Sequence, residues 1–273
     1  MLTTNDGVRL HYTDDGMGRP MLLVSGWSMS GEWFVEQRKH FAATHRVIVL
    51  DTRAQGKSEP VTWGHRLSRH AADLNDVITA LKLSDLTLVG WSRGTSVILS
   101  YLELFGTSKV RDIALAGFLP SLAARADWPW GFNVPPQAFI DSVVADYPKV
   151  VSEMIVNMTH QRLPADLVKM LTEESLRTPP LAASRMLQDH MNIDWRDQLG
   201  RIDRPVLICA GEQDPQAPVD AANASAALMQ EASVARFANS GHCPFIEEAA
   251  AFNASLAAFM TANETAHTHP GTT

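Results

Sequence analysis

The stretch Leu86-Thr-Leu-Val-Gly-Trp-Ser-Arg-Gly94 decides the fold of this chain. Its first four residues form a short apolar run, as buried parallel strands do, and a helical pattern follows Gly94. The Gly-x-Ser-x-Gly string between them predicts a tight strand-to-helix turn with Ser92 at its apex, because the flanking glycines remove side chains that would clash there. A serine that only caps the helix is the structural alternative. The stretch therefore indicates an α/β sheet with a candidate nucleophile above its carboxyl edge.

Short apolar runs of the same kind recur along the chain and alternate with helical patterns. In the segment 68–82, for example, the apolar residues from Leu74 to Leu81 recur at i, i+3, i+4 and i+7. Strands that alternate with helices predict a parallel sheet covered by helices on both faces. The expected strands are a hairpin at Val8–Tyr12 and runs at Met21–Val24, Val47–Leu50, Leu86–Val89, Ile113–Ala116, Val206–Cys209 and Ser233–Phe237.

Composition narrows the class of protein. The chain has 273 residues, of which 45% are hydrophobic and 19% charged, as in soluble globular proteins with one α/β domain and an insertion. A formal charge of −7 without a basic stripe argues against nucleic acid as a partner. No apolar run approaches the roughly 20 residues that span a bilayer, and the first residues lack a secretory pattern, so we expect a cytoplasmic protein without membrane contact. Cys209 and Cys243 have neither disulfide-framework nor metal-ligand spacing.

The strand–helix alternation stops at Pro120. The segment 123–196 has helical faces and no clean strand, so we expect it to be a helical cap inserted into an α/β core formed by 1–122 and 197–273. Its methionines and aromatic residues favour an apolar or aromatic small-molecule substrate, because flexible Met side chains adapt to varied shapes. Packing within the cap itself is the alternative for most of them. The candidate pocket residues are Trp91, Trp128, Trp130, Phe139, Met154 and Met158.

A nucleophilic serine needs a base, and the base needs an orienting group. The candidate base is His242, in a Gly-rich loop between the expected last strand and the final helix. The candidate acid is Asp214, which follows the strand Val206–Cys209; Glu212 is a rival, but it comes too early in the turn. The resulting chain order of serine, aspartate and histidine is the order expected when the serine lies on such a strand-to-helix turn.

An oxyanion formed at the serine needs two preorganised N–H donors. One candidate is the backbone N–H of Arg93, at the start of the helix. The other is the backbone N–H of Trp27, in the loop Ser25–Ser28. The turn Asp51–Ser58 is expected to support loops near the site without taking part in the chemistry.

Taken together, these motifs resemble the α/β-hydrolase superfamily over nearly the whole chain. The strings Ser25–Gly31 and Phe105–Val110 look like the cofactor-free haloperoxidase and arylesterase branch. The resemblance implies a mostly parallel eight-stranded sheet with helices on both faces and an inserted helical cap. The chain departs from that branch in its oxyanion loop, usually His-Gly-Trp-Pro, where Ser25 and Ser28 replace the histidine and the proline, and at Ala54, where a glycine is usual.

The resemblance implies acyl transfer to water through an acyl-enzyme on Ser92, and esters, lactones and carbon–carbon bonds beside a carbonyl remain open as substrates. A nucleophilic serine argues against dehalogenase and epoxide hydrolase chemistry, whose relatives attack with a carboxylate. Two alternatives stay open: a cofactor-independent oxygenase of the type that cleaves 3-hydroxy-4-quinolone rings, and a non-catalytic ligand-binding homologue. No metal site and no organic cofactor are implied, and the oligomeric state is left open.

Overall fold

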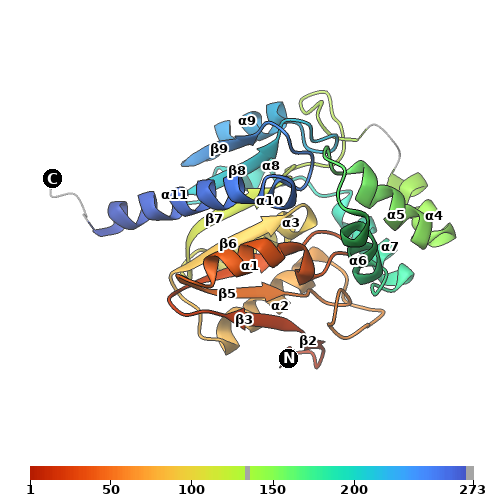
Figure 1. Ribbon diagram of the computed structural model, residues 1–273, viewed down its shortest axis with the longest axis horizontal. Helices are drawn as coiled ribbons and strands as arrows, with labels where there is room; N and C mark the ends of the chain where they lie inside the picture. The colour runs from red at the N-terminus through yellow and green to blue at the C-terminus, as the bar shows by residue number, and fades with distance from the viewer. Residues whose placement is uncertain (133–135, 269–273) are drawn as a thin grey trace.

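The computed structural model describes residues 1–132 and 136–268, and its centre is one twisted β-sheet (Figure 1). The strand order is β3-β5-β4-β6-β7-β8-β9. Strand β3 pairs antiparallel with β5, and every other pairing in this sheet is parallel. The strands are β3 (Tyr12–Asp15), β4 (Arg19–Val24), β5 (His45–Leu50), β6 (Leu86–Trp91), β7 (Val110–Ala116), β8 (Val206–Gly211) and β9 (Ala232–Phe237).

The main sheet has seven strands in the described ranges, not the eight that were expected. Strands β1 (Leu2–Thr3) and β2 (Arg9–Leu10) pair only with each other. Side chains of the segment after β5 accept the backbone N–H groups on either side of Leu10. The Arg9 N–H donates to the Glu59 carboxylate at 3.1 Å, and the His11 N–H donates to Ser58 Oγ at 2.8 Å. This N-terminal segment therefore closes the sheet edge against a turn and does not add a strand.

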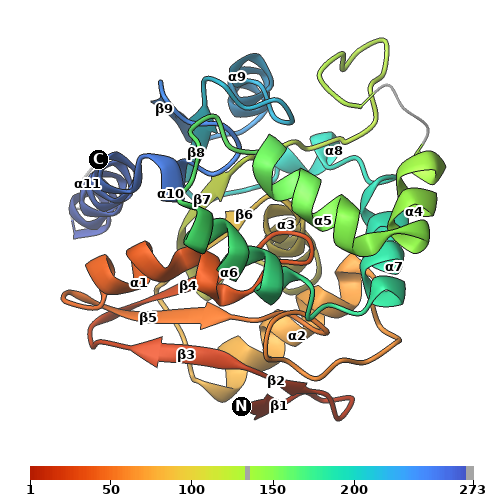
Figure 2. The ribbon, with the colours of Figure 1, turned by 45° about the vertical axis from the view of Figure 1, so that its right-hand side comes forward.

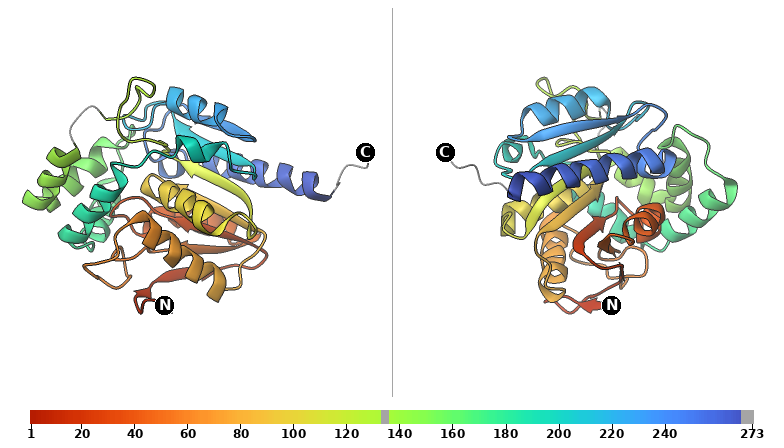
Figure 3. Two further views of the ribbon diagram at one scale, coloured as in Figure 1. Left: turned by 180° about the vertical axis from the view of Figure 1, so that it is seen from behind. Right: turned by 60° about the vertical axis from the view of Figure 1, so that its left-hand side comes forward.

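Helices cover both faces of the sheet, because its strand residues alternate between two apolar cores. Leu23 and Val49 pack on the face of α1 (Val35–Phe41) and α11 (Ala249–Thr268). Leu22 and Ile48 pack on the opposite face, against α2 (Leu67–Ala80) and α3 (Arg93–Phe105). Figure 3 shows α2 and α3 in front of the sheet when it is seen from behind. The short helix α9 (Val219–Ala227) also contributes to this second core.

Four helices between β7 and β8 lie together at one end of the sheet (Figure 2). They fall within the segment expected to form the cap, and their apolar residues join the core that contains α1 and α11. Helix α8 (Arg196–Leu199) leads back to β8, and α10 (Pro244–Glu247) precedes α11. No helix in the described part of the chain is long and apolar enough to cross a bilayer. The four helices are α4 (Pro136–Ala145), α5 (Tyr147–Asn157), α6 (Ala165–Ser175) and α7 (Pro180–His190).

Candidate active site

Ser92 occupies a strained turn between β6 and α3. Its φ of 52° and ψ of −122° lie in a region that residues with a side chain rarely adopt. The turn is held by two hydrogen bonds: the Ser92 N–H donates to the Ala116 carbonyl, and the Thr95 N–H donates to the Ser92 carbonyl, both at 2.9 Å. Glycine is required two residues after Ser92, because a Cβ at Gly94 would lie 2.2 Å from the Val24 carbonyl oxygen. The Gly-x-Ser-x-Gly string therefore forms the expected strand-to-helix turn.

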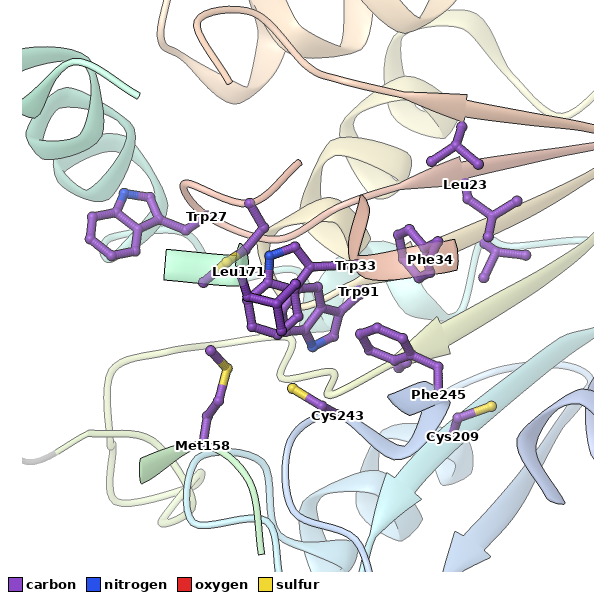
Figure 4. Packing of buried hydrophobic residues seen from close by; sticks show 14 of the residues in the cluster. Leu23, Trp27, Trp33, Phe34, Trp91, Met158, Leu171, Cys209, Cys243 and Phe245 are labelled. Carbon is purple, nitrogen blue, oxygen red and sulfur yellow. The ribbon is translucent and has the colours of Figure 1, made fainter. Parts of the chain in front are cut away.

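Trp91, the residue before Ser92, holds this turn in place by ring packing and one hydrogen bond. Its ring packs against Trp33 and Phe245, with centroids 4.9 Å apart in each pair (Figure 4). Its indole Nε1–H donates to the His242 carbonyl oxygen at 3.0 Å. Trp91 thus ties the turn that carries Ser92 to the loop that carries the candidate base.

His242 and Asp214 form a buried pair at the carboxyl edge of the sheet. The distance from His242 Nδ1 to Asp214 Oδ2 is 2.8 Å. The other carboxylate oxygen of Asp214 accepts the backbone N–H groups of Gln216 at 2.8 Å and Ala217 at 3.0 Å, so the carboxylate is fixed in place. His242 Nε2 is buried and has no hydrogen-bond partner among the described residues. Glu212, the rival acid, is exposed.

The loop around His242 is held from two sides. The His242 N–H donates to the Met158 carbonyl at 2.7 Å, which links this loop to the end of α5. The Gly241 N–H donates to the Glu247 carboxylate at 2.9 Å. A Cβ at Gly117, after β7, would lie 2.6 Å from His242 Cε1. Backbone contacts therefore fix the position of the imidazole.

The two expected oxyanion-hole donors belong to segments that border Ser92. Arg93 is the first residue of α3, so its N–H lies outside the hydrogen-bond ladder of the helix. The loop that carries Trp27 lies against the serine, since a Cβ at Gly26 would be 3.2 Å from Ser92 Cβ. Gln55 braces this loop, accepting the Ser28 N–H at 3.1 Å and donating to the carbonyls of Gly26 at 3.0 Å and Met29 at 2.8 Å. Neither the polar character of the 51–58 turn nor its spacing singled out this role of Gln55.

The Arg93 side chain points away from the cavity and is 1% exposed. Its Nη2 donates to the His65 carbonyl at 3.2 Å, and its Nη1 lies 3.4 Å from His70 Nδ1. Burial lowers the pKa of Arg93 to about 10. Burial also holds the pKa of His70 well below its usual value, with the Arg93 cation adding to the effect. A cation thus lies behind the nucleophile turn and leaves the cavity in front of it open.

A cavity of about 700 Å³ lies between the sheet edge and the inserted helices, and Ser92 and His242 line it. Four of the six expected pocket residues, Trp91, Phe139, Met154 and Met158, are in its wall. Phe132 and Met191, which belong to the aromatic and methionine residues of the expected cap, also line the cavity. The lining residues that the composition did not single out are Gly26, Met29, Gly117, Leu119, Leu122, Val150, Leu187, His190, Gln216 and Ala217, together with Ser142, Ala145, Asp146, Lys149, Glu153 and Asn157. The side-chain spacing along α5 was the available signal for the last three.

Trp128 and Trp130 do not line this cavity, which corrects the expectation for both. Their ring centroids lie 4.7 Å apart, and they pack in a small separate cluster with Leu119 and Ala217. The turn that begins at Arg125 causes this: the Arg125 and Trp128 backbones exchange hydrogen bonds of 2.8 and 3.0 Å, which folds the segment back on itself. These two rings therefore stabilise the segment between β7 and α4, which leads into the inserted helices.

Comparison with known proteins agrees with this geometry. The family described as alpha/beta hydrolase fold matches residues 19–249. The chain belongs to the α/β-hydrolase family. Its position within that family is the haloperoxidase and arylesterase-like branch, as its relatives indicate.

Two relatives illustrate the range of this family. The non-heme chloroperoxidase CPO-A1 of Kitasatospora aureofaciens is 29% identical, over 88% of this chain and 90% of that protein. The pimeloyl-[acyl-carrier protein] methyl ester esterase of Vibrio cholerae is 28% identical, over 92% of this chain and 98% of that protein. Among solved structures, the esterase EaEST of Exiguobacterium antarcticum superimposes with a TM-score of 0.91 at 27% identity, covering 96% of this chain and 100% of that one. These α/β-hydrolases support hydrolase activity for the chain.

Proposed function

We propose that this α/β-hydrolase cleaves a small apolar or aromatic carboxylic ester or lactone through an acyl-enzyme on Ser92. The carrying observation is the buried His242–Asp214 pair, whose Nδ1–Oδ2 distance is 2.8 Å and whose free Nε2 belongs to a residue lining the same cavity as Ser92. A carboxylate on Nδ1 keeps the proton there, so Nε2 is available as the base. The esterases among the related proteins also support ester cleavage as the reaction.

In the acylation step, Ser92 Oγ attacks the carbonyl carbon of the substrate while His242 Nε2 accepts the hydroxyl proton. The negative charge that develops on the carbonyl oxygen is stabilised by the backbone N–H groups of Trp27 and Arg93. Asp214 stabilises the imidazolium that forms. When the tetrahedral intermediate collapses, the alcohol leaves with the proton from His242, and for a lactone this alcohol remains joined to the acyl group.

In the deacylation step, water attacks the ester carbonyl of the acyl-enzyme. His242 Nε2 accepts a proton from this water, and the same two backbone donors stabilise the second oxyanion. Collapse of the second intermediate returns the proton to Ser92 and releases the carboxylic acid. The residues of the cavity wall support an apolar substrate, since Trp27, Phe139 and Met154 are among them.

The oxygenase alternative gains less support. That mechanism places the acid after the strand that here is β7, and the residues following Ala116 are Gly117 and Phe118, without a carboxylate. The Gly117 backbone lies against His242 instead. Asp214, after β8, is the carboxylate bonded to the imidazole, which favours the hydrolase.

The direct test is intact-mass analysis after treatment with a fluorophosphonate, on the parent protein, on Ser92→Ala and on Ser100→Ala. Ser100 also lies on α3, which makes it a matched control. We expect one adduct on the parent and on Ser100→Ala, none on Ser92→Ala, and turnover of phenyl esters or lactones only where the adduct forms. A folded parent protein with neither adduct nor ester or lactone turnover would overturn the proposal.

A further inference from the structure

One buried polar side chain in the cavity wall is not used by the mechanism above. His190 ends α7 and lines the cavity, and it is 6% exposed. Its Nε2 lies 3.0 Å from Ser96 Oγ. Ser96 follows Ser92 by four residues, a rise of about 6 Å along α3. The imidazole of His190 is therefore held beside the first turn of the helix that follows the nucleophile.

The hydrogen-bond chain through Ser96 determines the tautomer of His190. The indole Nε1–H of Trp195 donates to Ser96 Oγ at 3.0 Å. Ser96 is buried, and its own hydroxyl proton has no other acceptor within hydrogen-bond distance among the described residues. Since buried hydroxyl groups are rarely left unsatisfied, Ser96 donates to His190 Nε2. His190 Nε2 is thus an acceptor, and the ring proton is on Nδ1.

No hydrogen bond to His190 Nδ1 is found within the described ranges, although the residue is 6% exposed and lines the cavity. Burial lowers the pKa of His190 to about 3, and the nearby Arg93 cation acts in the same direction. The ring is consequently neutral near pH 7, so it offers a fixed donor and no charge. Its neighbours along α7 in the wall, Leu187 and Met191, are apolar and offer at most a weak sulfur acceptor. Because a buried N–H donor without a hydrogen-bond partner costs free energy, an acceptor atom on a bound ligand would stabilise it.

We propose that His190 donates a hydrogen bond from Nδ1 to an oxygen of the substrate other than the reacting carbonyl. The substrate class of the site is then an ester or lactone that carries a second oxygen acceptor within a few bonds of the scissile carbonyl, held in a cavity whose other buried wall residues are mostly apolar. His190 is a specificity-determining residue in this scheme and takes no part in proton transfer. The inference rests on the proposed function, because it assumes that Ser92 acylates in this cavity.

The test uses matched phenyl esters in which an ether oxygen replaces one methylene group. The pairs are butanoate with methoxyacetate, pentanoate with 3-methoxypropanoate, and hexanoate with 4-methoxybutanoate. Each kcat/KM is divided by the rate of hydroxide-catalysed hydrolysis of the same ester, which removes the inductive effect of the oxygen. In the parent protein we expect at least one ether ester to be favoured about five- to tenfold, the effect of one hydrogen bond to a neutral donor.

Three variants assign that preference. His190→Phe removes the donor and should bring the ratio within each pair close to one, whatever happens to the two separate values. His190→Gln keeps an N–H donor and should retain part of the preference. His40→Phe makes the same change at an exposed histidine on α1 and should leave the ratio as in the parent protein. A preference that is absent from the parent, or that survives in His190→Phe, overturns the inference.

A measurement on the parent protein does not depend on whether His190→Phe folds. Nitrogen-15 NMR of labelled histidine, assigned with His190→Gln, should show His190 with a protonated Nδ1 and an unprotonated Nε2 near pH 7; the opposite tautomer overturns the inference. The two proposals fail separately. Turnover of both members of every pair at equal normalised rates overturns the role of His190 alone, whereas absence of both adduct and turnover overturns the proposed function and this inference with it.

Discussion

The imidazole of His242 lies directly against the backbone of Gly117, so closely that a methyl group at that glycine would be 2.6 Å from His242 Cε1 and 2.8 Å from Nδ1. Gly117 also has a φ of +55°, which residues with a Cβ rarely adopt. The strand end at β7 therefore determines where the candidate base can lie. A residue without a side chain is therefore required at position 117 both by the imidazole of His242 and by the backbone conformation of the turn.

We expect Gly117→Ala to lower kcat for the best ester substrate by at least 100-fold, because the added methyl group displaces the imidazole from Asp214 and Ser92. The matched control is Gly106→Ala. Gly106 also has a positive φ, +73°, and nothing lies within 4 Å of its added Cβ, so the substitution strains the backbone without touching the site. Equal losses of kcat in the two folded variants would contradict the role given to Gly117.

Asp214→Asn tests the orienting acid. The amide oxygen of asparagine can still accept the N–H groups of Gln216 and Ala217, which leaves the NH₂ group facing His242 Nδ1. The imidazole must then carry its proton on Nε2, where the base is needed. We expect kcat to fall by about 10⁴-fold with little change in Tm. Steady-state kinetics should show the loss, and Glu212→Gln, at the exposed rival position, should stay within about twofold of the parent.

Ser28 explains why the loop of this chain departs from the His-Gly-Trp-Pro pattern. Its φ is +59°, whereas proline holds φ near −65°, and its N–H donates to Gln55 Oε1 at 3.1 Å. Ser28→Pro should therefore cost about 3 kcal/mol or more of folding free energy, a fall in Tm of roughly 6–12 °C for a chain of this length. Ser28→Gly accepts the same backbone conformation and should keep Tm within about 3 °C of the parent. Thermal unfolding followed by circular dichroism compares the two; a stable Ser28→Pro protein would contradict the argument.

Local sequence rules predicted the elements that local chemistry controls. Gly90 shows why the string forecast the strained turn: a Cβ there would lie 3.0 Å from the Thr95 backbone, five residues along the same turn. The number of strands was wrong, since whether β2 adds to the sheet depends on Glu59 and Ser58, which lie about 50 residues away in the chain.

The cavity wall was only partly predictable for a similar reason. Methionine and aromatic content indicated an apolar cavity, but it does not state which side of a loop faces inward, and the turn at Arg125 sends Trp128 and Trp130 elsewhere. Gln55 and His190 left no periodic signal, because each is a single polar residue whose partners come from distant segments. Such residues become visible only when the tertiary contacts are known.

Three buried histidines predict how stability depends on pH. Burial lowers the pKa of His65 to about 4 and of His190 to about 3, and holds that of His70 well below the ordinary value of 6.5. Between pH 6.5 and about 4 the unfolded chain binds protons that the folded protein does not, so stability is full above pH 6.5 and falls as the pH is lowered through this window. Each histidine contributes at most about 1.4 kcal/mol per pH unit to the slope. Urea unfolding of the parent, His65→Gln and His40→Gln proteins at pH 7, 6 and 5 should show a free energy of unfolding that depends less on pH in His65→Gln, by up to about 1.4 kcal/mol per pH unit, and as in the parent for exposed His40→Gln. The same dependence in all three proteins would mean that folded His65 binds its proton at the same pH as in the unfolded chain.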